Sequence, residues 1–362
     1  MDSFSYTFPA IRGIQAGKEY YVLLCPLKLL PKIFLFDEEE LTPELRAQRV
    51  INKARIPEIA SYIENNPKNY IFSALTASVD ADATFKPASD DSYNIGSLTL
   101  PMSAKFIIND GQHRRAAIEV ALKNCPELGD ETIPIVLFID LGLKKSQQMF
   151  SDLNRYAIRT TKSLSILYDN RDPWAVFVKE VIDEIDYFNG LVETEKSTIS
   201  NRSKKIFTLS ALYTATKELF GNIDEEPNEE DKVLAKEFWA SLWDIFPEWQ
   251  DIKDQELSAS QLRSDYINAH SIALIALGKA GNTLITKNPH NWKEQLKKIS
   301  SIDWHRDNTE VWEGRVTFNG KISNSRNNLT LLTNYIKTVL DLQLDKEESE
   351  TEQTLEEKAG AK

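Results

Sequence analysis

The chain has 362 residues, of which 41% are hydrophobic, 10% aromatic and 27% charged. At about 100–200 residues per domain this length predicts about two domains, and the composition excludes a disordered chain, a collagen-like fibre and a small disulfide scaffold. No run of about 18 apolar residues indicates a transmembrane helix, and the N-terminus lacks the pattern of a signal peptide. With two cysteines, Cys25 and Cys125, we expect a cytoplasmic protein with no membrane partner.

The net charge of −12 at pH 7 argues against a polyanionic partner, but the acidic residues are unevenly distributed. Segment 224–231 carries six acids and no base, and segment 343–362 has a net charge of −4. Together they account for −10 of the −12, so the remaining 334 residues are nearly neutral. A local basic surface for nucleic acid is therefore compatible with the composition, because association responds to the local field.

The first 165 residues alternate between strand-like and helix-like patterns. Apolar runs at 6–14 and 20–24 with Gly17 between them predict a hairpin, and Thr42 as N-cap predicts a helix over 43–65. The later expected elements are strands near 70–79, 103–108 and 133–139, a helix at 113–123 and a loop at 80–94. Strands alternating with helices indicate an α/β (α+β) domain over 1–165.

Beyond this boundary, residues 166–343 have the pattern of a helical domain. Apolar residues recur three and four positions apart in 174–188, 209–220, 233–246, 267–277 and 329–342. Only 315–318 is typical of a strand, and the acidic segment 224–231 is expected to be a solvated loop between helices. The tail 344–362 is so polar and charged that we expect it to be disordered.

The segment most informative about function is 106–117, FIINDGQHRRAA. A strand runs out into Asn-Asp-Gly and a helix starts at once, which leaves free backbone N–H groups at the positive end of the helix dipole. Gly111 permits close approach of a ligand, and His113, Arg114 and Arg115 add cationic donors. This pattern predicts a seat for a phosphate; the alternative is an ordinary turn whose surface arginines cap the helix.

Asp110-Gly111-Gln112-His113-Arg114 is the DGQHR motif, and the chain resembles the DGQHR-domain family, in particular the DndB family of DNA sulfur modification proteins. Segment 147–155 is similar to the second family block, QxxFxxLN, and segments 159–164 and 263–270 also resemble the DndB family, so the likeness spans about 5–340. The resemblance implies a DNA-binding transcriptional regulator of the genes for DNA phosphorothioate modification. It also implies double-stranded promoter DNA and other DNA modification proteins as partners, and a homo-oligomer.

The same junction is similar to the phosphate-binding boxes of ParB partition proteins and sulfiredoxins, with Gly111 and Arg114 matching both. This resemblance implies a ParB/sulfiredoxin-like N-terminal domain and a nucleotide, ATP or CTP, with its phosphate at Asp110, Gly111, Gln112, His113 and Arg114. Gln112 stands where sulfiredoxin has its cysteine nucleophile, which excludes that chemistry. The alternative function is a nucleotide hydrolase in which Gln112 and His113 are catalytic, and a third is an adaptor that binds neither ligand.

Two further groups of polar side chains complete the candidate sites. Asn154 and Arg155 are expected to turn toward the loop 111–114, or else to form a solvated face with Asn154 as a helix C-cap. The candidate DNA-binding cations are Arg46, Arg49, Lys53, Arg159, Lys162, Arg202, Lys204 and Lys205. The first three share one side of the predicted helix, and the last three lie in or beside the Ser/Thr/Asn-rich loop 197–203. The alternative for each group is a plain solvated surface.

The remaining chemistry-bearing residues predict no further site. The histidines show no metal-ligand spacing, and no Walker-type loop is present. Cys25 follows an apolar strand and is expected to be an inert buried thiol, and His270 lies in an apolar environment typical of a core histidine. We expect the seven tryptophans to form core rather than base-stacking platforms.

Overall fold

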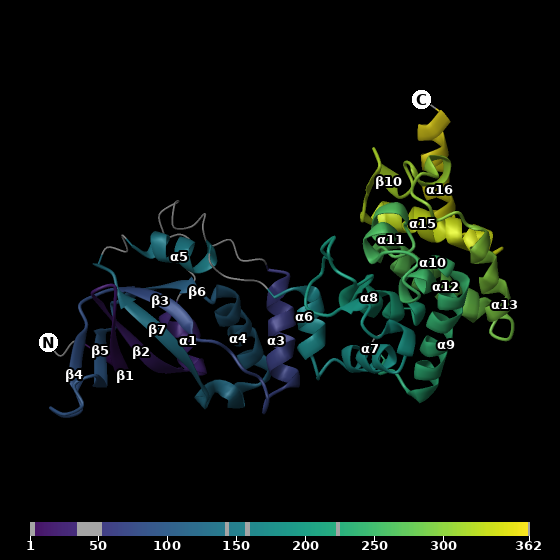
Figure 1. The fold of residues 1–362 in the computed structure, drawn as a ribbon. Helices are drawn as coiled ribbons and strands as arrows, with labels where there is room; N and C mark the ends of the chain where they lie inside the picture. Colours follow the sequence, from purple (N-terminus) through teal and green to yellow (C-terminus); the bar gives the residue numbers. More distant parts are fainter. Residues whose placement is uncertain (1–3, 35–52, 142–144, 156–159, 222–224, 361–362) are drawn as a thin grey trace. The chain divides into compact units, whose positions relative to one another are not determined.

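The computed structural model describes residues 4–34, 53–141, 145–155, 160–221 and 225–360. The chain divides into two compact units, residues 1–158 and 159–362, which are coloured purple to blue and teal to yellow in Figure 1. The sequence places this boundary near residue 165, at the point where the strand pattern ends. Each unit has its own hydrophobic core, so each is described separately below.

The first unit is built on a mixed sheet. Within the described residues seven strands pair in the order β4-β5-β1-β2-β7-β3-β6, and all neighbours are antiparallel except β3 and β7. The strands are β1 (Ser5–Gln15), β2 (Lys18–Pro26), β3 (Leu75–Asp80), β4 (Thr84–Pro87), β5 (Ile95–Pro101), β6 (Lys105–Asp110) and β7 (Thr132–Ile139). Together with the helices, this sheet confirms the α+β prediction.

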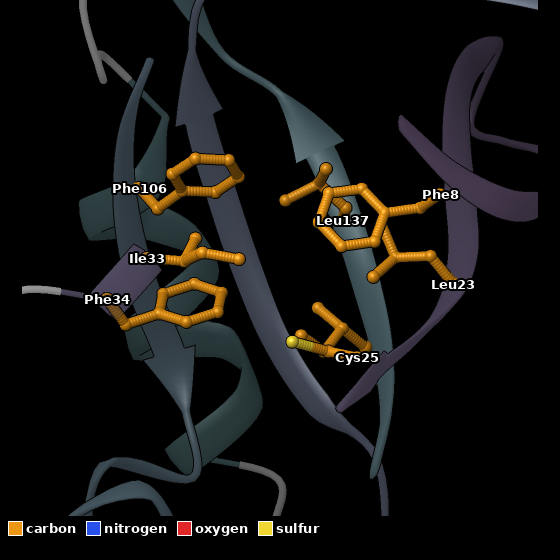
Figure 2. Close-up of a pocket in the computed structure, with 8 residues that line it drawn as sticks. Phe8, Leu23, Cys25, Ile33, Phe34, Phe106 and Leu137 are labelled. Carbon is orange, nitrogen blue, oxygen red and sulfur yellow. The ribbon is translucent and has the colours of Figure 1, made fainter. Parts of the chain in front are cut away.

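In the described part of this unit, three helices of 10 to 13 residues and three shorter helical segments accompany the sheet (Figure 1). They are η1 (Leu27–Leu29), α1 (Leu30–Ile33), α3 (Arg55–Asn65), α4 (Gln112–Asn124), η2 (Pro126–Asp130) and α5 (Ser146–Arg155). Figure 2 shows Phe8, Leu23, Cys25 and Leu137 pointing from their strands toward Ile33, Phe34 and Phe106 around a small apolar pocket. Burial raises the pKa of Cys25 to about 12, which makes this thiol inert as predicted.

The strand pattern of the first unit differs from the prediction between residues 80 and 101. The expected loop 80–94 contains β4, and β5 follows it. Strand β5 has the sequence IGSLTLP, in which Ile95 is exposed and only Leu98 and Leu100 are fully buried. This pattern alone is too weak to predict a strand. The segment is a strand because β1 and β4 pair with it on either side.

The second unit is helical, as its apolar spacing predicts. Its helices are α6 (Lys162–Tyr168), α7 (Pro173–Asp183), η4 (Asp186–Phe188), α8 (Leu209–Leu219), α9 (Glu229–Ile245), α10 (Pro247–Lys253), α11 (Ala259–Asp265), α12 (Ser271–Lys287), α13 (Trp292–Leu296), η5 (Lys297–Ser301), α14 (Thr309–Trp312), α15 (Arg326–Val339) and α16 (Lys346–Gly360). Two small sheets join β8 (Val192–Glu193) to β9 (Phe207–Thr208) and β10 (Thr317–Phe318) to β11 (Lys321–Ile322). Helix α12 packs against α8 and α15.

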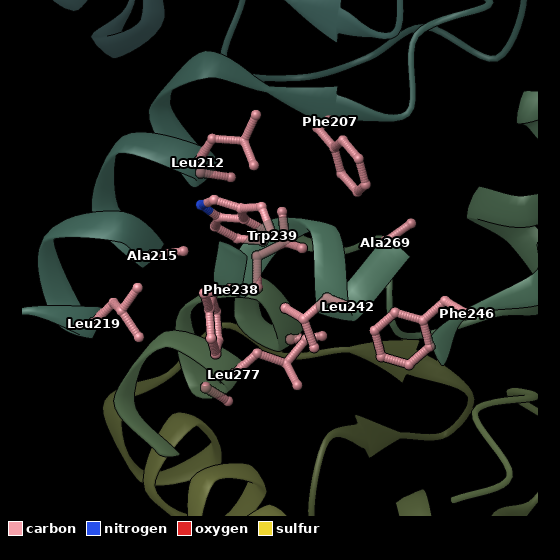
Figure 3. Close-up of a cluster of buried hydrophobic side chains, with 14 of the residues drawn as sticks. Phe207, Leu212, Ala215, Leu219, Phe238, Trp239, Leu242, Phe246, Ala269 and Leu277 are labelled. Carbon is pink, nitrogen blue, oxygen red and sulfur yellow. The ribbon is translucent and has the colours of Figure 1, made fainter. Parts of the chain in front are cut away.

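Aromatic side chains fill the core of the second unit. Figure 3 shows Phe238 and Trp239 of α9 lying between residues of α8 and α12. All seven tryptophans belong to this core and are buried, which confirms their prediction as core residues. The approach of α8 to α12 requires Gly278, because a Cβ atom there would lie 2.1 Å from the backbone oxygen of Ala215.

The prediction of a disordered tail is wrong over residues 346–360, which form α16. The Arg315 guanidinium forms two 2.8 Å bonds to the carboxylate of Glu352, and Lys337 pairs with Glu348. Glu348 and Glu352 of the tail are thus paired with cations that precede the tail in the chain. The polar composition of the tail does not predict these pairs. The acidic segment 224–231 also differs from the expected loop, because Asn228 forms a capping box that starts α9 at Glu229.

Candidate functional site

The DGQHR motif forms the expected junction between a strand and a helix. Strand β6 ends at Asp110, and Gly111 has a left-handed φ of 103° as the N-cap of α4, with no side-chain hydrogen bond to the cap. A Cβ atom at Gly111 would lie 2.3 Å from Cδ2 of Leu75. The motif therefore needs glycine at this position, and the start of α4 has no side-chain cap over its first amides.

Arg114 is engaged with the protein itself. Its Nη1 donates to the carbonyl oxygens of Ser73 at 2.6 Å and Ala74 at 3.1 Å, and also to the Ser73 hydroxyl. Its Nη2 donates to Oδ2 of Asp110 at 2.7 Å, and the side chain is 17% exposed. This guanidinium ties the segment preceding β3 to the motif, a role that the local sequence pattern does not reveal because residues 73 and 114 lie far apart in the chain.

The other polar side chains of the junction also bond inward. Gln112 Nε2 donates to the carbonyl oxygens of Ile108 at 3.1 Å and Asn109 at 3.4 Å. Arg115 is buried and donates to Glu119 at 2.6 Å, so it is not the surface cation that the sequence suggests. Burial and the nearby positive charge of Arg55 lower the pKa of His113, which favours its neutral form.

The second family block lies beside the first. Helix α5 packs against β6, the strand that ends in the motif, and Figure 1 draws the two elements side by side. The backbone of α5 places Asn154 and Arg155 in its last turn. Their side-chain positions lie outside the described part of the structure, so their predicted approach to the motif stays a prediction.

Of the four candidate DNA-binding cations in the first unit or at the start of the second, the structure places only Lys53. Arg46, Arg49 and Arg159 lie outside the described residues. Lys53 is exposed in a turn that precedes α3. Helix α3 begins at Arg55, so that Pro57 lies in the first turn, where a helix tolerates proline best. Lys53 is therefore not on the helix that the sequence predicts for it.

The cations of the second unit gather around one loop. We call residues 196–205 the basic loop; it lies between β8 and β9 and has no regular secondary structure, as predicted for 197–203. Arg202 and Lys204 are exposed and Lys205 is half-buried. None of the three forms an ion pair with a carboxylate among the described residues.

Lys162 lies at the start of a helix that is anchored beside this loop. The N-cap hydroxyl of Thr161 donates to the carbonyl oxygen of Glu195, the residue before the basic loop. The ammonium group of Lys162 donates to the hydroxyl of Thr214 at 3.0 Å, a neutral partner that leaves its charge uncompensated. Arg202, Lys204 and Lys205 thus lie in one loop, and Lys162 follows the residue that bonds to the segment preceding this loop.

The third segment that resembles the family, 263–270, supports the basic loop. Arg263 of α11 donates to backbone carbonyl oxygens of the loop, and the carbonyl oxygen of Arg263 accepts from Nε2 of His270 at 2.8 Å. Sequence analysis treats His270 as a core residue and includes Arg263 only in a segment that resembles the family, without a role. Among the described residues no group of His, Cys, Asp and Glu side chains could hold a metal ion, and no described helix is long and apolar enough to cross a membrane.

The hydrogen bonds of Arg114 predict a structural cost for its removal. Arg114→Ala leaves the carbonyl oxygens of Ser73 and Ala74 without their donor, and we expect a loss of about 2 kcal/mol or more in the free energy of unfolding. The measurement is denaturant unfolding followed by far-UV circular dichroism, since all tryptophans lie in the second unit. Lys123→Ala, on the exposed last turn of α4, is the control and should change stability by less than about 0.5 kcal/mol. Equal unfolding midpoints for the two variants would contradict the assignment.

The environment of His270 predicts acid sensitivity. Burial, followed by the charges of Arg306 and Arg263, holds the pKa of His270 below its ordinary value of 6.5. Because the unfolded chain then binds a proton that the folded chain does not, stability is complete above about pH 7 and falls as the pH drops through 6.5. His270→Gln should flatten the dependence of Tm on pH in this range, whereas His290→Gln, at an exposed position, should leave it unchanged. The prediction fails if the wild type and His270→Gln give parallel profiles.

Comparison with known proteins supports the resemblance carried by these segments. The family model for DndB, described as DNA-sulfur modification-associated, matches residues 8–343. No curated protein and no solved structure matches the chain, so the ParB/sulfiredoxin-like fold stays a prediction. The family match extends over both units and includes the DGQHR motif, α5 and the segment around Arg263. The chain therefore belongs to the DndB family, whose members take part in DNA sulfur modification.

Proposed function

We propose that this protein binds double-stranded DNA and regulates transcription of the genes of a DNA sulfur modification system. The observation that supports this function best is the basic loop, whose cations Arg202, Lys204 and Lys205 have no acidic partner among the described residues. Several other cations of the second unit pair with carboxylates, for example Lys232 with Glu180 at 2.8 Å, whereas the basic loop places three cations without such a partner within four consecutive residues. An uncompensated cluster in an acidic protein points to an anionic partner.

The composition of the basic loop suits a phosphate backbone. Serine, threonine and asparagine hydroxyl and amide groups alternate with the cations, and such groups commonly bond to phosphate oxygens and sugar. Lys162, which follows the Thr161 that bonds to Glu195, is a further candidate for a phosphate contact. Contacts of this kind position a protein on duplex DNA and make its affinity fall steeply with salt. We infer that a homo-oligomer would place several such loops along one promoter.

Removal of the three loop cations tests the DNA assignment. We expect the variant R202A/K204A/K205A to bind duplex DNA more weakly and to lower the slope of log K against log salt by about 0.9 for each phosphate that it no longer neutralises. The measurement is fluorescence anisotropy of labelled DNA over a range of salt concentrations. The matched control K253A/K287A/K321A removes the same charge from exposed lysines of the same unit. Identical salt slopes for the two variants would show that the basic loop is not the DNA-binding surface.

We propose in addition that the DGQHR junction binds the phosphate of a nucleotide, ATP or CTP, as a regulatory ligand. The support is the left-handed Gly111 and the start of a 13-residue helix without a side-chain cap. The inward bonds of Arg114 shape this seat, and Asn154 and Arg155 at the end of α5 remain proposed phosphate ligands. The Nε2 group of Gln112 bonds to backbone carbonyl oxygens, which favours binding over hydrolysis.

The carboxylate of Asp110 offers a test of this seat. Its side chain is 46% exposed beside Gly111, so its negative charge opposes an incoming phosphate. Asp110→Asn keeps an oxygen for Arg114 and should raise the affinity for ATP or CTP several-fold in isothermal titration. The Gln112→Ala variant should bind ATP or CTP with the affinity of the wild type, and neither protein should release phosphate from the nucleotide. The phosphate assignment fails if neither nucleotide binds the wild type or if Asp110→Asn leaves the affinity unchanged.

A further inference from the structure

The basic loop has its shape set by one side chain that lies outside it. Nη2 of Arg263 donates to the carbonyl oxygens of Ser200 at 3.0 Å, Asn201 at 3.3 Å and Ser203 at 3.2 Å. Nη1 donates to the carbonyl oxygen of Lys205. A single planar guanidinium thus accounts for four carbonyl groups within six consecutive residues. The loop has no regular secondary structure whose amides could bond to these carbonyl oxygens. The Arg263 guanidinium supplies the donors instead.

These bonds determine which groups the loop presents outward. The carbonyl oxygens carry partial negative charge and turn toward Arg263, away from an approaching anion. Arg202 and Lys204 lie between the bonded residues and are exposed, so their cationic groups face solvent. Without Arg263 the carbonyl oxygens would be free to turn outward, where they would repel phosphate and accept hydrogen bonds from the loop cations.

The backbone of Arg263 is fixed by hydrogen bonds from neighbouring segments. The carbonyl oxygen of Arg263 accepts a bond of 2.8 Å from His270, which begins α12 as its N-cap. Since a carbonyl oxygen only accepts, Nε2 of His270 carries the proton. The carbonyl oxygen of the nearby Asp265 accepts from the amide of Arg306 at 2.7 Å. The end of α11 is therefore fixed to two neighbouring segments, and the backbone that carries the Arg263 side chain is held in place.

We propose that Arg263 is a positioning residue for DNA binding, which holds the basic loop in the conformation that presents Arg202 and Lys204 to the phosphate backbone. This proposal rests on the proposed DNA-binding function. Arg263 acts through the loop and not on DNA, because its terminal nitrogens are directed at four carbonyl oxygens of the loop. Lysine cannot replace it, since one ammonium group lacks the planar set of donors that bonds four acceptors.

A mutant cycle on the full chain tests this role. The set comprises Arg263→Ala, Arg263→Lys, the double variant R202A/K204A and the triple variant R202A/K204A/R263A. We expect Arg263→Ala and the double variant each to weaken binding to duplex DNA by about tenfold at moderate salt and to lower the salt slope by a similar amount. The triple variant should bind no more weakly than the double variant, because Arg263 acts only through those two cations. Arg263→Lys should fall between the wild type and Arg263→Ala.

Limited trypsin digestion gives a readout of loop order that is independent of DNA. Trypsin cuts after Arg202, Lys204 and Lys205, so cleavage within 202–205 should be several-fold faster in Arg263→Ala than in the wild type. Tryptophan emission reports whether the second unit remains folded, since all seven tryptophans lie in its core. If Arg263→Ala does not fold, Arg263→Lys decides the question by the same two measurements.

The outcomes separate this proposal from the function on which it rests. If R202A/K204A binds DNA as the wild type does, the DNA assignment of the basic loop is wrong. If that variant binds weakly while Arg263→Ala binds normally, the loop assignment stands and the positioning role is wrong. If the losses from Arg263→Ala and R202A/K204A add in the triple variant, Arg263 contacts DNA directly, which overturns the proposal.

Discussion

Both units depend on the same interaction, a partly buried arginine that donates to backbone carbonyl oxygens of an irregular segment. Arg114 holds residues 73 and 74 against the DGQHR motif, and Arg263 holds the basic loop. Carbonyl groups outside helices and strands need donors when water is excluded. The guanidinium supplies several donors in one plane. Each arginine thereby fixes a backbone segment that has no regular secondary structure to hold it.

This constraint changes what the basic residues of the chain do. Arg114, Arg115 and Arg263 lie in or near the most characteristic segments of the family, yet their guanidinium groups bond inward to carbonyls or to a neighbouring carboxylate. Among the described residues, the basic loop gathers three cations without a carboxylate partner in a less conspicuous stretch of sequence. The arginines of these family segments are therefore structural residues, because their guanidinium groups fix nearby backbone or pair with a neighbouring carboxylate.

The sequence analysis succeeded where the signal is local. The hairpin around Gly17, the strand-to-helix junction at Gly111 and the helices of the second unit follow from apolar periodicity and turn chemistry. It failed at β5, whose apolar residues are few, and at α16, whose acids looked unsuited to folding. Each of these elements is stabilised by partners distant in the chain, and no local pattern contains that information.

By itself, the sequence determined the class of fold, the helical character of the second unit, the buried tryptophans and the membership of a DNA sulfur modification family. Composition and spacing are sufficient for the fold class, the helical unit and the buried tryptophans because they depend on residues close together in the chain, whereas the family membership rests on a likeness that spans residues 8–343. Only the tertiary structure decided that Arg114 bonds to Ser73 and Asp110 and that Arg263 orders the basic loop. The donors and acceptors of these bonds are mostly separated by about forty to sixty positions, and folding alone brings them within hydrogen-bonding distance.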